Sequence, residues 1–315
     1  MSPDVGLHEN VGLIDFESMF PNILVRRKIS YEIVSFESKD RASDSQMGLL
    51  GALTKDVLER RLYFKHLKKS LPTDGLEWVW CDQRQRALKE ILVCIYGYSG
   101  CFANRFGNVT VYQEINKIAR EELVKSMKIA TKKGFQVIYG DNDSLFLKKQ
   151  DASSEDYKEL AREISKRVGL PMALDHHFKF LVLLSQKGYE KQGAPKRYYG
   201  RLVDGSDYYR GIELRRRDTP PFLKHFQKKI MEILFAAESS AGVIKNLKKV
   251  EEYVLEIRKK ISKGKMELDE LVISKTLRKD IKDYKVRPPH IIAAKILTQK
   301  GVNPRSGDVV DFIYT

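Results

Sequence analysis

The chain has 315 residues, 42% of them hydrophobic, and 57 Lys and Arg against 42 Asp and Glu give a net charge of +15. That apolar content suffices for one large or two to three smaller domains. The basic excess fits a polyanionic partner, nucleic acid before an anionic membrane, but charge alone leaves mere solubility open. The polar start MSPDVGLHEN, the lack of a membrane-length apolar run and three cysteines without CxxC spacing exclude a signal peptide, a membrane span and a zinc or disulfide framework.

The N-terminal third begins with a short apolar run. Val11–Ile14 predicts a buried strand that delivers the carboxylate of Asp15 at its end. Two helices are predicted next, at 52–69 and 82–97, with the breaker SLPTDG between them. Together these helices would form an antiparallel hairpin.

A helix and a β-hairpin are predicted in the middle of the chain. Residues 112–133 place apolar side chains every four positions before Gly134, which is typical of a helix with a glycine at its end. The apolar runs FQVIY and SLFLK then flank a short polar turn and predict a β-hairpin. Residues 153–169 predict a further helix, opened by serine and acidic side chains.

The composition changes near 216–220, at RRRDTPP, where we place a domain boundary. Residues 178–217 predict strands, whereas the chain after about 218 predicts helices, with the apolar stripe from Ile244 to Ile261 expected to be core. The adjacent His176 and His177 would point to opposite sides of a strand and make a poor metal pair. The fold class is therefore α+β: a core interrupted by a helical hairpin and followed by a helical module.

The turn of the predicted hairpin, YGDNDS at 139–144, concentrates negative charge in a basic protein. Asp141 and Asp143 are ordinary turn residues, so a surface turn is one interpretation. A metal site is the other, because carboxylates brought together repel unless a cation lies between them. With Asp15, these aspartates would suit Mg²⁺ and a two-metal phosphoryl transfer. The sequence shows only that Asp15 and the turn both lie at strand ends.

Six segments, in order along nearly the whole chain, resemble the motifs of family B DNA polymerases, most closely archaeal ones. Their sequences are DFESMFPNI (15–23), RQRALKEILVCIYGYSG (84–100), YGDNDS (139–144), APKRY (194–198), RGIELRRRD (210–218) and DYKVRPPHIIAAKILTQKGV (283–302). A short YGDxDS arises by chance, but six ordered elements do not. The resemblance therefore identifies the chain as similar to a DNA-directed DNA polymerase.

The resemblance implies a right-hand architecture with an antiparallel-sheet palm, helical-hairpin fingers and a mainly helical thumb. We expect the palm at 1–47 and 101–216, the fingers at 48–100, and an incomplete thumb at 217–315. The implied partners are primer–template DNA and dNTP, with no membrane. An intracellular location is expected, in the cytoplasm or nucleoid if the source is prokaryotic.

The same resemblance assigns the catalytic centre. Asp15 and Asp143 match the metal-ligating aspartates, Asp141 matches a supporting companion, and Phe16 would offer its backbone carbonyl to the metal. Two Mg²⁺ ions are the implied cofactors, and Mn²⁺ can substitute for them. The reaction is template-directed addition of dNTP to a primer 3′-hydroxyl.

Substrate contacts are assigned in the same way. Arg61, Lys65 and Lys89 match residues that hold the triphosphate, Phe20 stands where the family has a steric-gate tyrosine, and Tyr96 matches the tyrosine beside the templating position. These five form the expected nucleotide-binding set. A phenyl ring at Phe20 can still crowd a ribose 2′-hydroxyl.

DNA contacts are implied for five further residues. Gly97 would permit close approach of the duplex, and Lys196 and Arg197 match residues that touch the primer–template. We expect Tyr198, in the same element, and Arg216, in the following element RGIELRRRD, to join them. Each phosphate contact would add salt dependence to binding.

The sequence also departs from the family pattern. The fingers asparagine is Val93 and the serine after it is Cys94, while Asn142 replaces a threonine. Carboxylate motifs of the exonuclease domain do not fit upstream of Asp15, so we expect no proofreading site in this chain and a second chain that supplies the N-terminal and exonuclease portion, as in a split polymerase.

Two other functions stay open at this point. A catalytically degenerate, polymerase-like subunit for DNA binding or assembly would fit Val93 and the missing upstream half, although all three carboxylates are present. Another palm-type nucleotidyltransferase, such as a reverse transcriptase or cyclase, would fit the aspartates but not the fingers and thumb segments.

Overall fold

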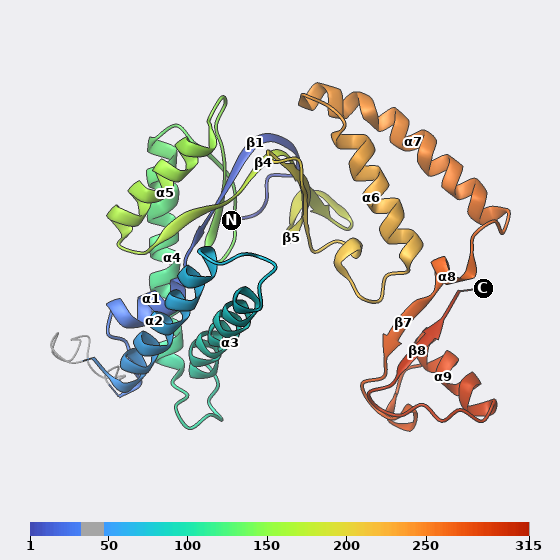
Figure 1. The fold of residues 1–315 in the computed structure, drawn as a ribbon, viewed down its shortest axis with the longest axis horizontal. Coiled ribbons are helices and arrows are strands. Elements are labelled where there is room, and N and C mark those ends of the chain that lie inside the picture. The colour runs from blue at the N-terminus through green and yellow to red at the C-terminus, as the bar shows by residue number, and fades with distance from the viewer. Residues whose placement is uncertain (33–46, 315) are drawn as a thin grey trace. The chain divides into compact units, whose positions relative to one another are not determined.

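A computed structural model describes residues 1–32 and 47–314 and divides into two compact units (Figure 1). The first unit comprises Met1 with Gly12–His176, and the second comprises Ser2–Val11 with His177–Thr315. The boundary expected near 216–220 thus falls inside the second unit, and the borders of palm, fingers and thumb stay predictions. Within the described ranges, every helix is too short or too polar to traverse a bilayer.

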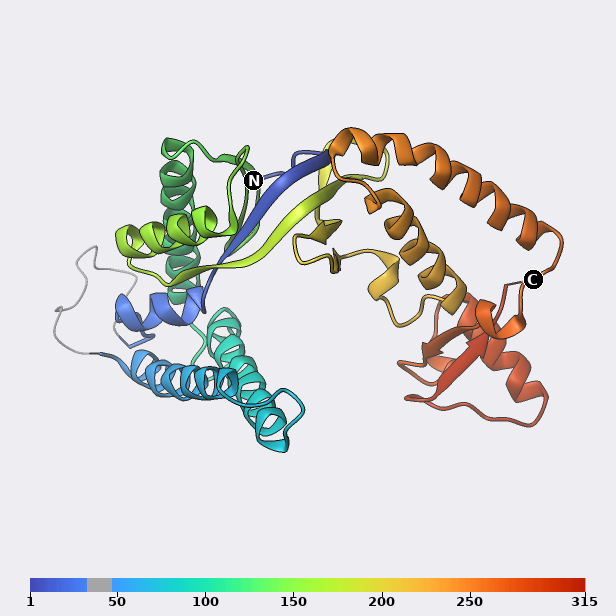
Figure 2. The same ribbon diagram turned by 45° about the horizontal axis from the view of Figure 1, so that its top comes forward.

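The first unit is organised around the predicted hairpin. Strands β2 (Gln136–Gly140) and β3 (Ser144–Lys148) pair antiparallel across the aspartate-bearing turn, which confirms the hairpin. On the other side of β3 lies β1 (Gly6–Phe16), in the strand order β2-β3-β1-β4-β5-β6. Figure 2 shows β1 beside β4 (Met172–Gln186). The sequence located only the apolar end of β1, because its first half is polar.

Three helices pack with these strands. They are α1 (Met19–Arg26), α4 (Val109–Lys132) and α5 (Ser154–Val168). The Asn108 side chain accepts hydrogen bonds from the first backbone N–H groups of α4, and Ser153 forms a capping box with Asp156 at the start of α5. These polar side chains therefore fix where α4 and α5 begin, and of the two only the serine was noted in the sequence.

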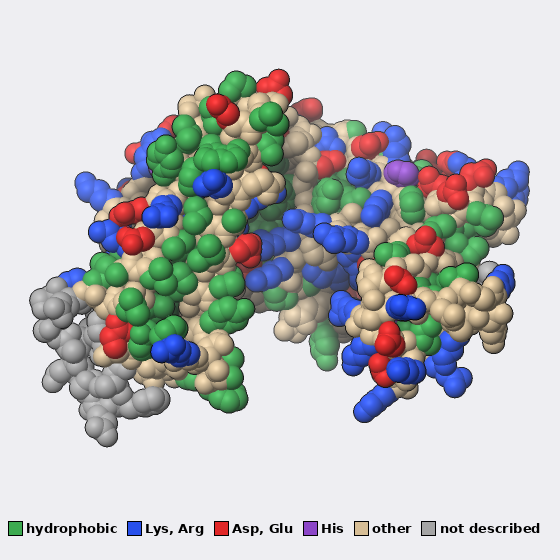
Figure 3. All heavy atoms as spheres, turned by 60° about the horizontal axis from the view of Figure 1, so that its bottom comes forward, with side chains coloured by type: hydrophobic (Ala, Val, Ile, Leu, Met, Phe, Trp, Pro, Cys, Tyr) green, Lys and Arg blue, Asp and Glu red, His purple; other side chains and the backbone are tan. Residues whose placement is uncertain are grey.

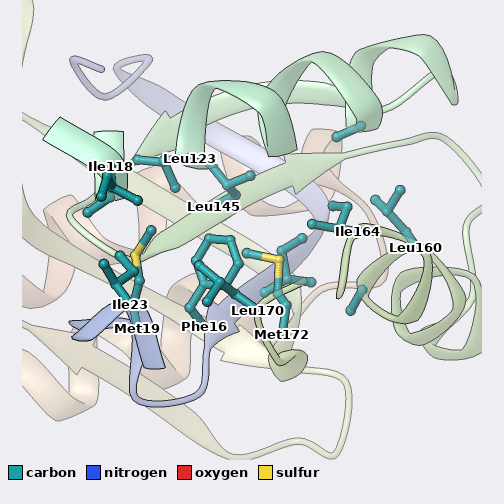
Figure 4. Close-up of a cluster of buried hydrophobic side chains, with 14 of the residues drawn as sticks. Phe16, Met19, Ile23, Ile118, Leu123, Leu145, Leu160, Ile164, Leu170 and Met172 are labelled. Atoms are coloured by element: carbon teal, nitrogen blue, oxygen red, sulfur yellow. The ribbon is translucent and has the colours of Figure 1, made fainter. Parts of the chain in front are cut away.

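The core of this unit lies between the helices and the sheet. Figure 4 shows Phe16 from β1, Met19 and Ile23 from α1, and Leu145 from β3 meeting side chains of α4 and α5. All of these are buried. Since Phe16 directly follows Asp15, the packing of its ring anchors the strand end that carries the carboxylate.

The predicted helical hairpin is present and longer than expected. Helices α2 (Leu49–Lys69) and α3 (Leu76–Ser99) contact each other along their lengths, and α3 begins directly after Gly75 rather than at 82. A buried carboxylate ties them together: Asp82 on α3 accepts from Lys68 Nζ at 2.8 Å and from Arg86 Nε at 2.7 Å. Burying such a charge is tolerable only when it is paired this way.

The second unit joins an antiparallel sheet to two long helices. Strands β4, β5 (Tyr189–Leu202) and β6 (Asp207–Arg210) pair in sequence order. A short 3₁₀ helix, η1 (Glu213–Arg215), leads to α6 (Pro221–Phe235) and α7 (Ser240–Ser262). Phe180, Met231 and Val243 lie in the core that these elements share.

The C-terminal part of this unit contains strands that the sequence analysis missed. Its elements are α8 (Leu268–Leu271), β7 (Ile273–Thr276), η2 (Ile281–Asp283), α9 (Pro289–Gln299) and β8 (Val309–Phe312). Strands β7 and β8 form a separate two-stranded sheet, and α9 packs against it through Ile291 and Ala294. Figure 3 shows many Lys and Arg side chains on this module.

The stripe from Ile244 to Ile261 was wrongly expected to be core. Helix α7 buries Val243 and Asn246, which lie on a neighbouring face of the helix. In the stripe itself, Ile244 is 60% exposed and Ile261 is 46% exposed. The spacing of three and four identified the helix correctly, but a helix with apolar residues on two faces does not reveal which face packs.

Candidate active site

The end of β1 and the turn between β2 and β3 are joined by a backbone hydrogen bond. The amide of Phe16 donates to the carbonyl oxygen of Asp143 at 2.9 Å, and the amide of Asp141 closes the turn by donating to the carbonyl of Ser144 at 3.0 Å. The predicted site residues Asp15, Asp141 and Asp143 are thus brought to one place. The sequence could not establish this, because β1 and the turn are far apart along the chain.

The Asp15 carboxyl lies in an unfavourable setting for a negative charge. Burial, followed by repulsion from Asp143 and Asp175, raises its pKa to about 7, although the Phe16 amide and the charge of Lys89 oppose the shift. Its Oδ1 atom is buried and has no hydrogen-bond partner among the described residues. A carboxylate oxygen left in this state is costly, and a bound cation would remove the cost.

The residues at the end of β1 and in the β2–β3 turn suit a hard divalent cation. In the part of the chain that the structure describes, no cluster of three or more His, Cys, Asp or Glu side chains could hold a metal on its own. Mg²⁺ does not need one, since it is usually bound by one or two carboxylates together with substrate phosphates. Asp15 and Asp143 with the backbone carbonyl of Phe16 would provide that donor set, and the Asp15 Oδ1 atom, unpartnered among the described residues, is consistent with the fit.

The two residues after Phe16 form a strained turn. Ser18 has φ 54° and ψ 51°, a left-handed conformation that is uncommon for a residue with a side chain. The Asn22 side chain braces it, donating from Nδ2 to the carbonyl oxygens of Glu17 at 2.8 Å and Ser18 at 3.1 Å. The turn is therefore held in place beside the carboxylates.

Two predicted triphosphate ligands on α2 contact this turn. Arg61 donates from Nη1 to Ser18 Oγ, and Lys65 donates from Nζ to Glu17 Oε1. Burial alone would raise the pKa of Glu17, but the hydrogen bond and charge of Lys65 lower it. Burial also lowers the pKa of Arg61, whose Nε has no partner among the described residues. Both cations face the strand end that carries Asp15.

The third predicted triphosphate ligand lies on α3. Lys89 is exposed, and its positive charge acts on the Asp15 carboxyl. Further along α3, Val93 is 52% exposed, and a Cβ added at Gly97 would meet no atom within 4 Å. The helix therefore presents Lys89, Val93 and Gly97 to open space.

The predicted steric-gate and template residues are in direct contact. The Phe20 and Tyr96 rings are stacked, with centroids 4.2 Å apart and planes 7° apart. The Tyr96 hydroxyl donates to Asn116 Oδ1 on α4 at 2.8 Å. The sequence analysis predicted both rings but not their contact.

In the second unit, two predicted DNA-binding elements meet. The Arg197 guanidinium donates from Nε to the carbonyl of Gly211 at 3.1 Å and from Nη2 to Glu213 at 3.2 Å. Lys196 has φ 61°, and a Cβ at Gly211 would lie 2.1 Å from the Lys196 carbonyl oxygen, so only glycine allows this approach. The motifs APKRY and RGIELRRRD thus form one local structure.

Two other predicted DNA-binding residues have different surroundings from those we expected. Tyr198 is only 1% exposed and stacks on Tyr208, so its side chain cannot form a surface contact in this conformation. Burial raises its pKa, as expected for a phenol inside the sheet. Arg216 forms a two-fold ion pair with Asp218, at 3.0 and 2.9 Å. Tyr198 therefore supports the strand, whereas Arg216 lies at the surface with its charge already paired.

The sequence analysis missed three residues of the site. Glu17 lies inside the first motif and carries a charge, which could have suggested a partner for Lys65. Asp175 acts on Asp15 from β4, and Asn116 holds Tyr96 from α4. No local pattern marks these last two residues, because both depend on how distant elements pack.

Comparison with known proteins extends these observations. A sequence model of DNA polymerase family B matches residues 1–315. The chain is 28% identical over 312 residues to a DNA polymerase of Archaeoglobus fulgidus, and 26% identical over 329 residues to DNA polymerase 2 of Aeropyrum pernix. These matches cover 96% and 100% of this chain but 38% and 39% of the two relatives.

A solved structure is also similar. The family B DNA polymerase from the hyperthermophilic archaeon Pyrobaculum calidifontis matches with a TM-score of 0.71 and 28% sequence identity. The match covers 100% of this chain and 41% of that one. The chain therefore spans about two fifths of the length of the relatives it resembles.

Proposed function

The chain belongs to DNA polymerase family B, and on that premise we propose that it carries the nucleotide-adding site of a DNA-directed DNA polymerase. The reaction is attack of a primer 3′-hydroxyl on the α-phosphate of a dNTP. The observation that supports this most is the hydrogen bond from Phe16 N to Asp143 O, because it holds two half-buried, mutually repelling carboxylates at one point.

In this proposal, Asp15 and Asp143 hold Mg²⁺ with the carbonyl of Phe16. When bound, the ions neutralise the charge that develops on the attacking and leaving oxygens. Asp141 supports the turn through its backbone bond to Ser144. Because the pKa of Asp15 is raised to about 7, part of the population is protonated near neutral pH, and only the deprotonated carboxylate would hold a cation.

The triphosphate would bind to the cations beside the strained turn. Lys65 is paired with Glu17, and Arg61 with Ser18, so an incoming triphosphate must replace those partners. The Nε of Arg61, which has no partner within residues 1–32 and 47–314, leaves one buried donor for a phosphate oxygen. Lys89 adds charge from α3.

We further propose that Lys196, Arg197 and Arg216 contact the primer–template, with Tyr198 supporting their strand from inside. A degenerate, non-catalytic role is not favoured, because a buried and repelling carboxylate is costly to keep without a use. Three expectations stay predictions: a second chain, the lack of proofreading and an intracellular location. Co-purification from the native source tests whether a second chain is bound.

The central test is primer extension with dNTP and Mg²⁺. We expect Asp143→Ala to lower the rate by about 10³-fold or more, since metal ligation contributes several kcal/mol at the transition state. Asp74→Ala, at an exposed aspartate in the turn between α2 and α3, is the matched control and should extend normally. The proposal fails if the wild type makes no product with Mg²⁺ or Mn²⁺, either alone or with a candidate second chain.

A further inference from the structure

Phe20 belongs to a stack of three aromatic rings. Tyr96 lies on Phe20 with centroids 4.2 Å apart, and Tyr112 of α4 lies on the other side of Tyr96 at 5.2 Å with planes 22° apart. The stack therefore links α1, α3 and α4. Because Phe20 carries no hydroxyl, its ring cannot be oriented by a hydrogen bond of its own, so its position depends on the ring beneath it.

The middle ring is fixed by the amide of Asn116. The Tyr96 hydroxyl donates to Asn116 Oδ1 at 2.8 Å, and Asn116 Nδ2 donates to the backbone carbonyl of Tyr112 at 2.8 Å. The two bonds use both ends of the amide, which sets its orientation. Burial, together with a hydrogen bond between the Tyr96 and Tyr112 hydroxyls, raises the pKa of Tyr96. Tyr96 is thus held as a neutral, hydrogen-bonded ring.

The far end of the stack rests on a glycine. A Cβ added at Gly100 would lie 2.9 Å from the Tyr112 ring, closer than real Cβ atoms come to such a neighbour. The last glycine of the motif RQRALKEILVCIYGYSG therefore makes room for Tyr112. Each ring of the stack thus has a neighbour that limits its movement.

We propose that Asn116 is a positioning residue for sugar discrimination, which holds Tyr96 so that Phe20 stays where a ribose 2′-hydroxyl would collide with it. The inference rests on the proposed function, in which Phe20 takes the place of the steric gate. Asn116 acts through Tyr96 and does not touch the nucleotide. A mere packing role would affect dNTP and rNTP use equally, whereas a positioning role changes their ratio.

The test measures kcat/KM for one dNTP and the matching rNTP in the same primer-extension assay. We expect Asn116→Leu, similar in size but without hydrogen bonds, to lower the dNTP/rNTP ratio by about tenfold, which corresponds to about 1.4 kcal/mol of discrimination. Asn116→Asp keeps an acceptor for the Tyr96 hydroxyl and should retain most of the ratio. Gln113→Leu, an exposed amide on the same helix, is the control and should leave the ratio unchanged.

Two further variants keep the proposal testable if Asn116→Leu does not fold. Tyr96→Phe removes the hydroxyl that Asn116 holds and should lower the ratio to the same extent, and adding Asn116→Leu to it should bring no further loss. Phe20→Ala should lower the dNTP/rNTP ratio more than either variant.

An unchanged ratio in Asn116→Leu or Tyr96→Phe, with dNTP extension intact, overturns this inference and leaves the proposed function standing. Absence of wild-type dNTP extension would instead count against the function itself.

Discussion

The predicted catalytic carboxylate of the first unit and the predicted DNA-binding arginines of the second have opposite electrostatic surroundings. In the first, the Asp15 carboxylate has a buried oxygen without a partner among the described residues and repels its neighbour Asp143. In the second, Arg197 is bonded to Glu213 and Arg216 to Asp218, so the predicted DNA-binding cations are already paired. Unrelieved charge costs stability unless a ligand supplies the counter-charge, and this supports the proposal that the first unit carries the nucleotide-adding site.

The largest expected effect comes from removing the unrelieved charge. Asp15→Asn should lower the rate of primer extension by about 10³-fold or more, because it removes a proposed metal ligand. It should also stabilise the metal-free protein. Because the folded pKa of about 7 lies above the ordinary value of 3.8, folded-state stability is lost as the pH rises through 7. In EDTA, the unfolding temperature of Asp15→Asn should therefore exceed that of the wild type chiefly at pH 8, and much less at pH 5.

The matching measurement adds Mg²⁺ to the same proteins. Ion binding to the folded state should raise the unfolding temperature of the wild type more than that of Asp15→Asn. An equal rise in both proteins would contradict the assignment of Asp15 as a ligand, whatever the variant's activity.

A smaller effect is expected at the turn beside the carboxylates. Lys65→Ala should raise the KM for dNTP by about tenfold, since a charge-assisted hydrogen bond to phosphate contributes about 1.5–3 kcal/mol. Glu17→Gln should do the reverse and lower the KM by a few-fold, because Lys65 no longer has to leave a carboxylate. Steady-state kinetics with one dNTP checks both, and a raised KM in Glu17→Gln would show that Glu17 helps the triphosphate to bind.

The smallest effect tests the paired cations of the second unit. Asp218→Asn should free Arg216 and strengthen binding to primer–template by a few-fold, with a steeper fall of affinity with salt, by about one phosphate contact. Arg216→Gln should have the opposite effect, so that the affinity for primer–template falls less steeply with salt than in the wild type. Fluorescence anisotropy over a salt series measures both, and identical slopes in the two variants would remove Arg216 from the DNA-binding set.

The elements that depend on local patterns could be predicted from the sequence. The helix at 112–133 and the hairpin around YGDNDS were located by periodicity and by turn residues, and their observed bounds differ by a few positions. The polar half of β1 and the short strands β7 and β8 were missed. Such strands are defined by their pairing partners rather than by their own composition.

The candidate site shows the same division. Asp15 and Asp143 could be identified from the sequence, because both lie in recognisable motifs. Asn116 and Asp175 are defined by contacts between distant elements, and Tyr198 shows that a residue within a motif can face inward. The exposed stripe on α7 likewise shows that periodicity identifies a helix without revealing which face packs.

The hydrogen bond between Phe16 and Asp143 joins two main-chain groups, not two side chains. A substitution at Asp15 or Asp143 therefore removes a carboxylate without removing the link that aligns the two segments. Variants at these positions can report on catalysis separately from architecture. For the same reason, a descendant that had lost one of these aspartates would retain the geometry and would need only a single codon change to recover the carboxylate.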